Sequence, residues 1–290
     1  MWADSNLEVK KLLLEIIKFL FYSGLIVLIS KYILVGALRK LAENLNLKAQ
    51  TVGDIAGMAT SVPELLTITT SSLRGLSGAS IYNILSSNII NLIQYLAAII
   101  LNKNADKLRN KAIKLDMILV VITIIIPVIL LKMKIELNIF IIPVFILLYI
   151  FFRFINNNAH KLYLNKEDKE IEEEIETERK SEKRNNRKAA RYVLILLLTG
   201  ILLYVVGELL GNTLESLCNS FNVPEVIVGI LLGFITSIPE LITFFESQKH
   251  NKKNGDDMVG VIEATNNLLT SNMFNLFIIQ TIGIVLINIL

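Results

Sequence analysis

Long apolar blocks, each close to the length of a membrane-crossing helix, constrain this chain more than any other feature. A bilayer core of about 30 Å needs roughly 20 helical residues. Blocks of about that length lie near residues 12–41, 52–73, 79–101, 115–131, 135–154, 192–219, 223–247 and 258–290. Hydrophobic residues make up 53% of the chain and the mean hydropathy is +0.57, a value that a domain with a polar surface rarely reaches. We therefore predict an all-α polytopic membrane protein with about eight transmembrane helices.

Charge and cysteine content exclude several other classes. The net charge of +3 is too small to indicate nucleic-acid binding, and the basic residues lie between the apolar blocks. The single cysteine, Cys218, excludes an internal disulfide and a thiolate cluster for a structural metal. The first block follows a segment without a small-residue cleavage site, so we expect a retained helix and not a signal peptide.

A charged stretch divides the chain and helps to orient it. We expect a first repeat at 1–155 with about five helices, a charged linker at 156–190, and a truncated second repeat at 191–290 with about three. The loops after the third, fifth and seventh blocks are rich in Lys and Arg. Because cytoplasmic loops carry the excess of positive charge, these loops and the linker are predicted to be cytoplasmic and the N-terminus outside. The expected location is the cell membrane.

The two halves of the chain repeat each other. TSVPELLT at 60–67 is nearly identical to TSIPELIT at 236–243, and YNILSSNIINL at 82–92 resembles NNLLTSNMFNL at 266–276. Glu64 then corresponds to Glu240, 176 positions later, and Ser87 to Ser271, 184 positions later. Two correlated motifs in the same order indicate an internal duplication.

The number of blocks between the copies sets their relative orientation. Five apolar spans separate the first half from the second, and an odd number inserts the second copy upside down. The prediction is an inverted-topology repeat with its pseudo-two-fold axis in the membrane plane. Such an axis brings the two octapeptides together near the bilayer midplane.

Each octapeptide has the composition of a cation site. Proline lacks an N–H and interrupts the helix, and in a membrane the carbonyls that it frees are tolerated only where they line a cavity. We expect free carbonyls at 57–60 and 233–236, hydroxyl oxygens from the Thr-Ser pairs, and charge from Glu64 and Glu240. A carboxylate deep in a membrane marks function by default. Sites made only of oxygen suit hard cations such as Ca²⁺ and Na⁺.

The second motif of each copy can complete the site. Ser87 and Asn91 are spaced i, i+4 and share one helix face, as do Ser271 and Asn275. Their neighbours Asn88 and Asn272 fall on an adjacent face and are expected to pack against the interrupted helices. Together these oxygens suffice for one Ca²⁺ or for several Na⁺.

At these residues the chain resembles the sodium/calcium exchanger family of the cation/calcium antiporter superfamily, whose repeats contain G-T-S-x-P-E followed by G-S-N-x-x-N or a close variant. The resemblance covers the first three and last three blocks. It implies alternating access, with Ca²⁺ and Na⁺ as transported substrates competing for one midplane site, and no cofactor. The implied ligands are the carboxylates Glu64 and Glu240, the amides Asn91 and Asn275, the hydroxyls of Thr60, Ser61, Ser87, Thr236, Ser237 and Ser271, and the carbonyls of Gly57 and Gly233.

The chain departs from the family pattern at several positions. The glycine before T-S is replaced by Ala59 and Ile235, and the glycine before S-N by Ser86 and Thr270. Some family members have Asp at the position of Asn275. The family usually has ten helices, five per repeat, whereas eight are expected here. The resemblance implies that the two helices without a counterpart pack beside the core and supply none of the main ligands.

Alternatives remain open at this point. Glu64 and Glu240 can also serve as helix-capping acids, and Asn91 and Asn275 as interhelical hydrogen-bonding groups; for Asn83 and Asn267 we favour that structural role. Glu263 is interpreted as a solvated helix end or a cytoplasmic entrance. For function, the alternatives to Na⁺-driven Ca²⁺ exchange are cation/proton exchange and a non-transporting membrane remnant or subunit that binds cations. A homo-oligomer is compatible with each of these functions. No catalytic constellation points to an enzyme.

Overall fold

The structure, a computed structural model, describes residues 2–45, 49–133, 138–163, 186–253 and 257–289, and every regular element in these ranges is a helix. The long and half-length α-helices are α1 (Trp2–Ile29), α2 (Gly36–Asn44), α3 (Ala49–Thr60), α4 (Val62–Ser72), α5 (Ser77–Leu101), α6 (Lys111–Lys132), α7 (Ile142–Tyr163), α9 (Asn186–Glu215), α10 (Glu225–Thr236), α11 (Ile238–Lys253), α12 (Asp257–Met273) and α13 (Gln280–Ile289). Short π or 3₁₀ segments are η1 (Ser30–Val35), η2 (Lys107–Arg109), η3 (Ile139–Ile141), η4 (Ser216–Ser220) and η5 (Phe274–Ile279).

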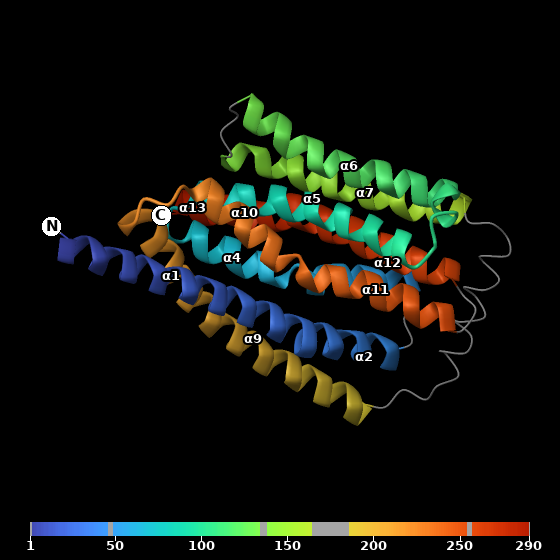
Figure 1. The fold of residues 1–290 in the computed structure, drawn as a ribbon. Coiled ribbons are helices and arrows are strands. Elements are labelled where there is room, and N and C mark those ends of the chain that lie inside the picture. Colours follow the sequence, from blue (N-terminus) through green and yellow to red (C-terminus); the bar gives the residue numbers. More distant parts are fainter. Residues whose placement is uncertain (1, 46–48, 134–137, 164–185, 254–256, 290) are drawn as a thin grey trace.

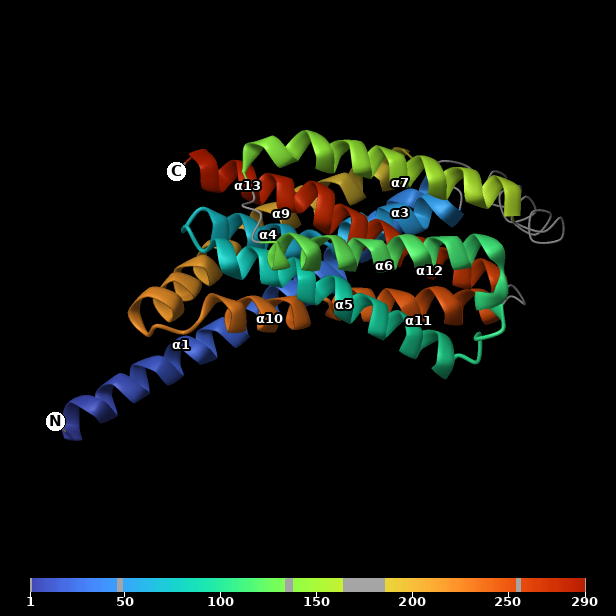
Figure 2. The same cartoon turned by 90° about the horizontal axis from the view of Figure 1, so that it is seen from above.

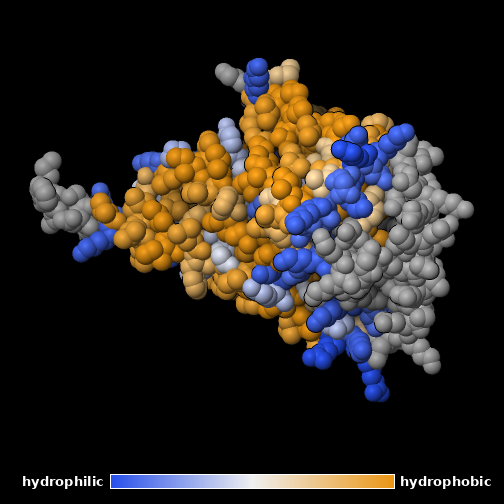
Figure 3. All heavy atoms as spheres, turned by 45° about the vertical axis from the view of Figure 1, so that its right-hand side comes forward, coloured by the Kyte–Doolittle hydropathy of each residue, from blue (hydrophilic) through white to orange (hydrophobic). Residues whose placement is uncertain are grey.

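Seven helical stretches in the described part of the chain are long and apolar enough to cross a membrane. They are Glu8–Leu38, Ser77–Leu101, Lys111–Lys132, Ile139–Asn158, Arg187–Ser220, Glu225–Lys249 and Met258–Ile289. The other predicted block, 52–73, corresponds to α3 and α4. These helices have 12 and 11 residues, so the two together make up one passage through the membrane. Apolar side chains cover the flank of the bundle and hydrophilic ones gather towards one end (Figure 3). The fold class predicted from the sequence is confirmed, and the protein is an integral membrane protein.

The two halves of the chain run in opposite directions through the bundle. α3 and α4 follow each other from one end to the other, and α10 and α11 run the opposite way beside them (Figure 1, Figure 2). α1 packs against α9, the first helix of the other half. The N-terminus and C-terminus lie at one end of the bundle, whereas α7 ends and α9 begins at the other. The start of α1 and the two helix ends that flank the charged segment therefore lie at opposite ends of the bundle. Which side is cytoplasmic stays a prediction, as does the division at 156 and 190, because most of that charged segment lies outside the described residues.

The two broken helices are interrupted at corresponding serines of the two repeats. Ser61 separates α3 from α4 with φ −81° and ψ 3°, and Ser237 separates α10 from α11 with φ −79° and ψ 0°. Pro63 and Pro239 then lie in the first turn of the following helix, where a missing N–H costs nothing. Both halves of the repeat thus place their glutamate, Glu64 or Glu240, in the first turn of a half-helix.

Two apolar clusters hold the broken helices in place. One contains side chains of α5, α6, α7, α12 and η5, where Phe277 makes edge-to-face contacts with Phe145 and Phe152 at centroid distances of 5.8 and 5.3 Å. The other joins α1 and α9 to α10 and includes Ile26, Leu210 and Leu232. The polar residues of the two repeats lie between these clusters.

Candidate cation site

All twelve residues predicted to bind cations are buried. Glu64 and Glu240 are 0% exposed although each carries a carboxylate. Their half-helices meet near the middle of the bundle (Figure 1). The other ten predicted residues come from both repeats. In the first repeat they are Gly57 and Thr60 at the end of α3, Ser61 at the helix junction, and Ser87 and Asn91 in α5. In the second repeat they are Gly233 and Thr236 at the end of α10, Ser237 at the helix junction, Ser271 in α12 and Asn275 in η5.

Hydroxyl contacts join the two repeats at this point. The Ser61 and Ser271 oxygens are 2.9 Å apart, and the Ser271 hydroxyl donates to Glu240 Oε1 at 3.1 Å. On the other side of the pseudo-two-fold axis, the Ser237 hydroxyl donates to the Ser87 carbonyl at 3.5 Å. Residues 210 and 150 positions apart in the chain therefore share one polar interior.

The asparagines pair across the axis. Asn88 Nδ2 donates to the Asn272 carbonyl at 3.2 Å, and Asn272 Nδ2 donates to the Asn88 carbonyl at 3.1 Å. Asn91 Nδ2 donates to Asn272 Oδ1, and Asn275 Nδ2 to Asn88 Oδ1, each at 3.2 Å. Asn88 and Asn272, which were expected to pack against the interrupted helices, contact each other and orient Asn91 and Asn275.

A second amide pair has the structural role predicted for it. Asn83 Nδ2 donates to Thr67 Oγ1 and Asn267 Nδ2 donates to Thr243 Oγ1, both at 2.6 Å. Each threonine hydroxyl in turn donates to the carbonyl of the neighbouring glutamate, Glu64 at 3.0 Å and Glu240 at 2.9 Å. These bonds fix each half-helix that carries a glutamate to the helix packed beside it.

Several buried oxygens in this interior have no hydrogen-bond partner among the described residues. They are Glu64 Oε1 and Oε2, Glu240 Oε2, Thr236 Oγ1, and the Oδ1 atoms of Asn83, Asn91, Asn267 and Asn275. An unpaired buried polar group costs about 1–3 kcal/mol, and more if it is charged. The amide nitrogens of Asn91 and Asn275 are used within the protein while their oxygens are not, so the unpaired atoms are those that a cation needs.

The electrostatics of the interior favour a positive ion. Glu64 lies close enough to Glu240 for the two carboxylates to interact, and Thr236 and Thr60 lie beside Glu64 and Glu240 respectively. In the part of the chain that the structure describes, no cluster of three or more His, Cys, Asp or Glu side chains is placed to hold a metal. The charge of the candidate site therefore comes from two carboxylates, and its other ligands are neutral oxygens, which suits Ca²⁺ or Na⁺.

The glycine carbonyls differ from the sequence-based expectation. The Gly57 carbonyl accepts from the hydroxyls of Ser61 at 2.9 Å and Thr60 at 3.2 Å. The Gly233 carbonyl accepts from the Ser237 hydroxyl at 2.7 Å. The expectation that these carbonyls are free was wrong, because each also keeps the backbone N–H of the serine four residues on, at 3.3 Å. Pro63 and Pro239 instead remove the donors to the carbonyls four residues before them, at positions 59 and 235. Each carbonyl oxygen thus accepts at least two hydrogen bonds, which use both of its lone pairs, so ligation would require a hydroxyl to turn away.

Close helix crossings explain why glycine occupies these positions. A Cβ on Gly57 would lie 2.7 Å from the Asn267 carbonyl oxygen. A Cβ on Gly233 would lie 2.7 Å from the Asn83 carbonyl oxygen and 2.8 Å from the Ser87 nitrogen. Since these are backbone atoms, α3 can approach α12, and α10 can approach α5, only without a side chain at the crossing.

We expect Gly233→Ala to destabilise the protein by about 1–3 kcal/mol, because overpacking at a backbone contact must push α10 away from α5. The thermal midpoint should fall by about 2–4 °C per kcal/mol. Gly200→Ala is the matched control: Gly200 lies in α9, and a Cβ added there would have nothing within 4 Å, so the midpoint should stay the same or rise. Equal midpoints for the two variants in a thermal-shift measurement would show that the crossing is not tight.

A charged network beside the site was missed by the sequence analysis. Arg153 of α7 donates to both oxygens of Asp54 on α3, at 2.7 and 2.6 Å. Thr270, which replaces a family glycine, donates to Asp54 Oδ1 at 2.8 Å. Both charged residues lie inside predicted apolar blocks, and a charge within a membrane-spanning segment is the sequence signal that could have revealed this network.

Glu263 also differs from its sequence-based interpretation. Its carboxylate is buried at 2% exposure and accepts a hydrogen bond from the Ser247 hydroxyl at 2.8 Å. The interpretation of Glu263 as a solvated helix end was therefore wrong.

Comparisons with known proteins bear on the family and on the fold of this chain. A family model described as sodium/calcium exchanger protein matches residues 16–156 and 191–289. A structure of the sodium-calcium exchanger NCX_Mj soaked with 10 mM Na⁺ and zero Ca²⁺ is similar, with a TM-score of 0.52 and 20% identity over 95% of this chain and 83% of that chain. A second NCX_Mj structure, soaked with 100 mM Na⁺ and 10 mM Sr²⁺, gives 0.52 and 22% over the same shares. Such low identity establishes the fold alone. None of the curated proteins matches this chain.

Proposed function

Because the chain belongs to the sodium/calcium exchanger family, we propose that it exchanges Ca²⁺ for Na⁺ across the membrane at a single site shared by its two repeats. The observation that carries the proposal is the set of unpaired buried oxygens from Glu64, Glu240, Asn91 and Asn275. Both repeats contribute to this set equally, with one carboxylate and one amide each. The transported ions are substrates, and no resident cofactor is part of the proposal.

The ligand set gives a physical reason for exchange. Two carboxylates supply two negative charges, which one Ca²⁺ neutralises and which more than one Na⁺ can neutralise in its place. Since a buried charge is costly unless it is paired, the site is stable when loaded with either ion. Ca²⁺ and Na⁺ then compete for the same oxygens, and a gradient of one drives the other when the site opens alternately to the two sides.

The experiment is ⁴⁵Ca²⁺ uptake into proteoliposomes that contain the purified protein. With Na⁺ loaded inside and none outside, we expect uptake at least tenfold above that of vesicles without a Na⁺ gradient. Uptake that is the same with and without the gradient contradicts the proposal. Counterflow of labelled against unlabelled Ca²⁺ then distinguishes a transporter from a protein that binds cations without moving them.

Cation/proton exchange is a second candidate, favoured by one observation. The Glu64 and Glu240 carboxylates lie close together in a water-poor interior, and a proton neutralises such a pair as a metal ion does. The neutral oxygens of the site favour Na⁺, because a proton needs no cage of ligands. In the same vesicles, a pH gradient imposed without Na⁺ should leave Ca²⁺ uptake at its background level; uptake driven by that gradient would support the second candidate.

A further inference from the structure

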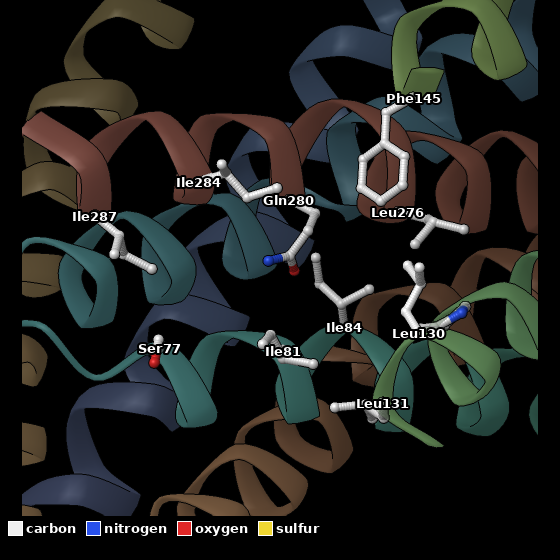
Figure 4. Close-up of a pocket in the computed structure, with 11 residues that line it drawn as sticks. Ser77, Ile81, Ile84, Leu130, Leu131, Phe145, Leu276, Gln280, Ile284 and Ile287 are labelled. Atoms are coloured by element: carbon white, nitrogen blue, oxygen red, sulfur yellow. The ribbon is translucent and has the colours of Figure 1, made fainter. Parts of the chain in front are cut away.

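A cavity of about 310 Å³ lies outside the candidate cation site, between α5, α6, the start of α7, and the continuous stretch of η5 and α13 (Figure 4). Nine of its eleven lining residues are apolar, and none carries a charge. The two polar residues are Ser77 and Gln280; the apolar ones are Ile81, Ile84, Pro127, Leu130, Leu131, Phe145, Leu276, Ile284 and Ile287. The cavity is at the small end of the range for pockets that hold small molecules.

Gln280 makes this cavity unlike an ordinary packing defect. Its side chain is only 3% exposed, and the structure gives its amide no hydrogen-bond partner among the described residues. Figure 4 shows the amide directed from α13 towards Ile81 and Ile84 of α5, into the cavity. A primary amide has two donors and an acceptor with two lone pairs, and the cavity is the space from which a ligand can satisfy them.

The repeat shows that an amide is not needed here for packing. The residue that corresponds to Gln280 in the first repeat, 184 positions earlier, is Leu96, which packs against an apolar cluster. A leucine of similar size therefore satisfies the equivalent position in the other half of the fold. The amide at Gln280 serves something other than the contact between these helices.

The shape and position of the cavity select the ligand class. Ser77 begins α5 and is exposed, whereas Ile84 and Ile284 are buried, so the cavity runs inwards from one end of the bundle. Its α6 wall contains Pro127, whose ring lacks the N–H of a normal helical residue. The neighbouring Val128 and Ile129 are 44% and 48% exposed on the apolar flank. A ligand can thus enter from the membrane interface with its apolar part first.

We propose that this cavity binds an uncharged single-chain amphiphile, whose hydrocarbon chain lies against the isoleucines and leucines and whose hydroxyl or carbonyl group bonds with the Gln280 amide. A charged head group finds no counter-ion in the lining, and the volume is too small for the two chains of a phospholipid. The cavity is adjacent to the candidate cation site, because Leu276 of its wall is next in sequence to Asn275.

The test is photolabelling of the purified full chain with a diazirine-bearing decanol, followed by mass-spectrometric mapping. We expect labels on residues 77–84 and 276–287, and we expect excess 1-decanol to compete for them at least tenfold better than decane, which has no hydroxyl. Gln280→Leu should reduce this labelling at least fivefold. Ile282→Leu, on the outer face of the same helix, should leave it unchanged.

A second variant keeps the test decisive if Gln280→Leu fails to give a monodisperse, helical protein. Ile287→Phe adds volume at a half-buried position of the cavity wall and should likewise reduce labelling at least fivefold, whereas Ile282→Phe should not. Labelling spread evenly over the exposed faces of α1, α9 and α13, or equal in Gln280→Leu and wild type, overturns the proposal and makes the cavity part of the ordinary lipid-facing surface.

Discussion

Glu64→Gln and Glu240→Gln should each reduce Na⁺-driven Ca²⁺ uptake by at least 100-fold. Glutamine keeps the size of the side chain but removes the charge that a buried divalent cation needs. A 100-fold loss corresponds to about 2.7 kcal/mol, which is modest for a charge removed from a buried, charge-paired site. Both changes should be equally severe, because the two repeats contribute one carboxylate each to the same ion.

The matched control is Glu246→Gln, which removes an exposed carboxylate from α11, the helix that carries Glu240. Its uptake should stay within twofold of the wild-type rate. Far-ultraviolet circular dichroism and gel filtration should show that all three variants are folded. If only one of the two buried glutamate variants loses Ca²⁺ uptake, the ion is bound by one repeat alone, which contradicts a site shared by both repeats.

Arg153→Met should be the most destabilising single change outside the candidate site. The Arg153 guanidinium pairs with Asp54 through two bonds, with side-chain exposures of 25% and 12%. Removing one partner leaves a buried charge unpaired, which costs about 3–5 kcal/mol. The thermal midpoint should therefore fall by roughly 6–20 °C, at about 2–4 °C per kcal/mol.

The double variant Asp54→Asn with Arg153→Met should recover most of that loss, since no buried charge is then left alone. Lys107→Met is the control, because Lys107 pairs with Asp106 at the exposed end of the bundle and such pairs contribute about 1 kcal/mol or less. A midpoint for Arg153→Met equal to that of Lys107→Met would mean that the ion pair between α3 and α7 is solvated.

The repeat and the residues of the candidate site follow from the sequence because their information is local. Each octapeptide contains its own helix break and its own carboxylate, and the parity of the spans between the copies decides their relative direction. The spacing of Ser87 and Asn91 places them on one helix face without knowledge of any partner. For these reasons the fold class could be predicted from the amino-acid sequence.

The contacts that were missed depend on residues far apart in the chain. Arg153 and Asp54 are 99 positions apart, and Thr270 is 216 positions from Asp54. No periodicity reports such a pairing. The expectation of free carbonyls at Gly57 and Gly233 was wrong for a different reason. Proline removes the donor to the carbonyl four residues before it, whereas these two carbonyls lie further from the proline and keep their backbone N–H partner. Gln280 gave no signal either, because one amide in a long apolar block is compatible with many surroundings.

The proposed function depends on both repeats holding the same ion, and the number of ions bound tests this directly. Equilibrium dialysis of the purified protein against ⁴⁵Ca²⁺ without Na⁺ should give one Ca²⁺ per chain. Glu64→Gln and Glu240→Gln should each abolish that binding completely. Two Ca²⁺ per chain, with one retained in each single variant, would mean that the repeats bind their ions independently and would contradict a shared site.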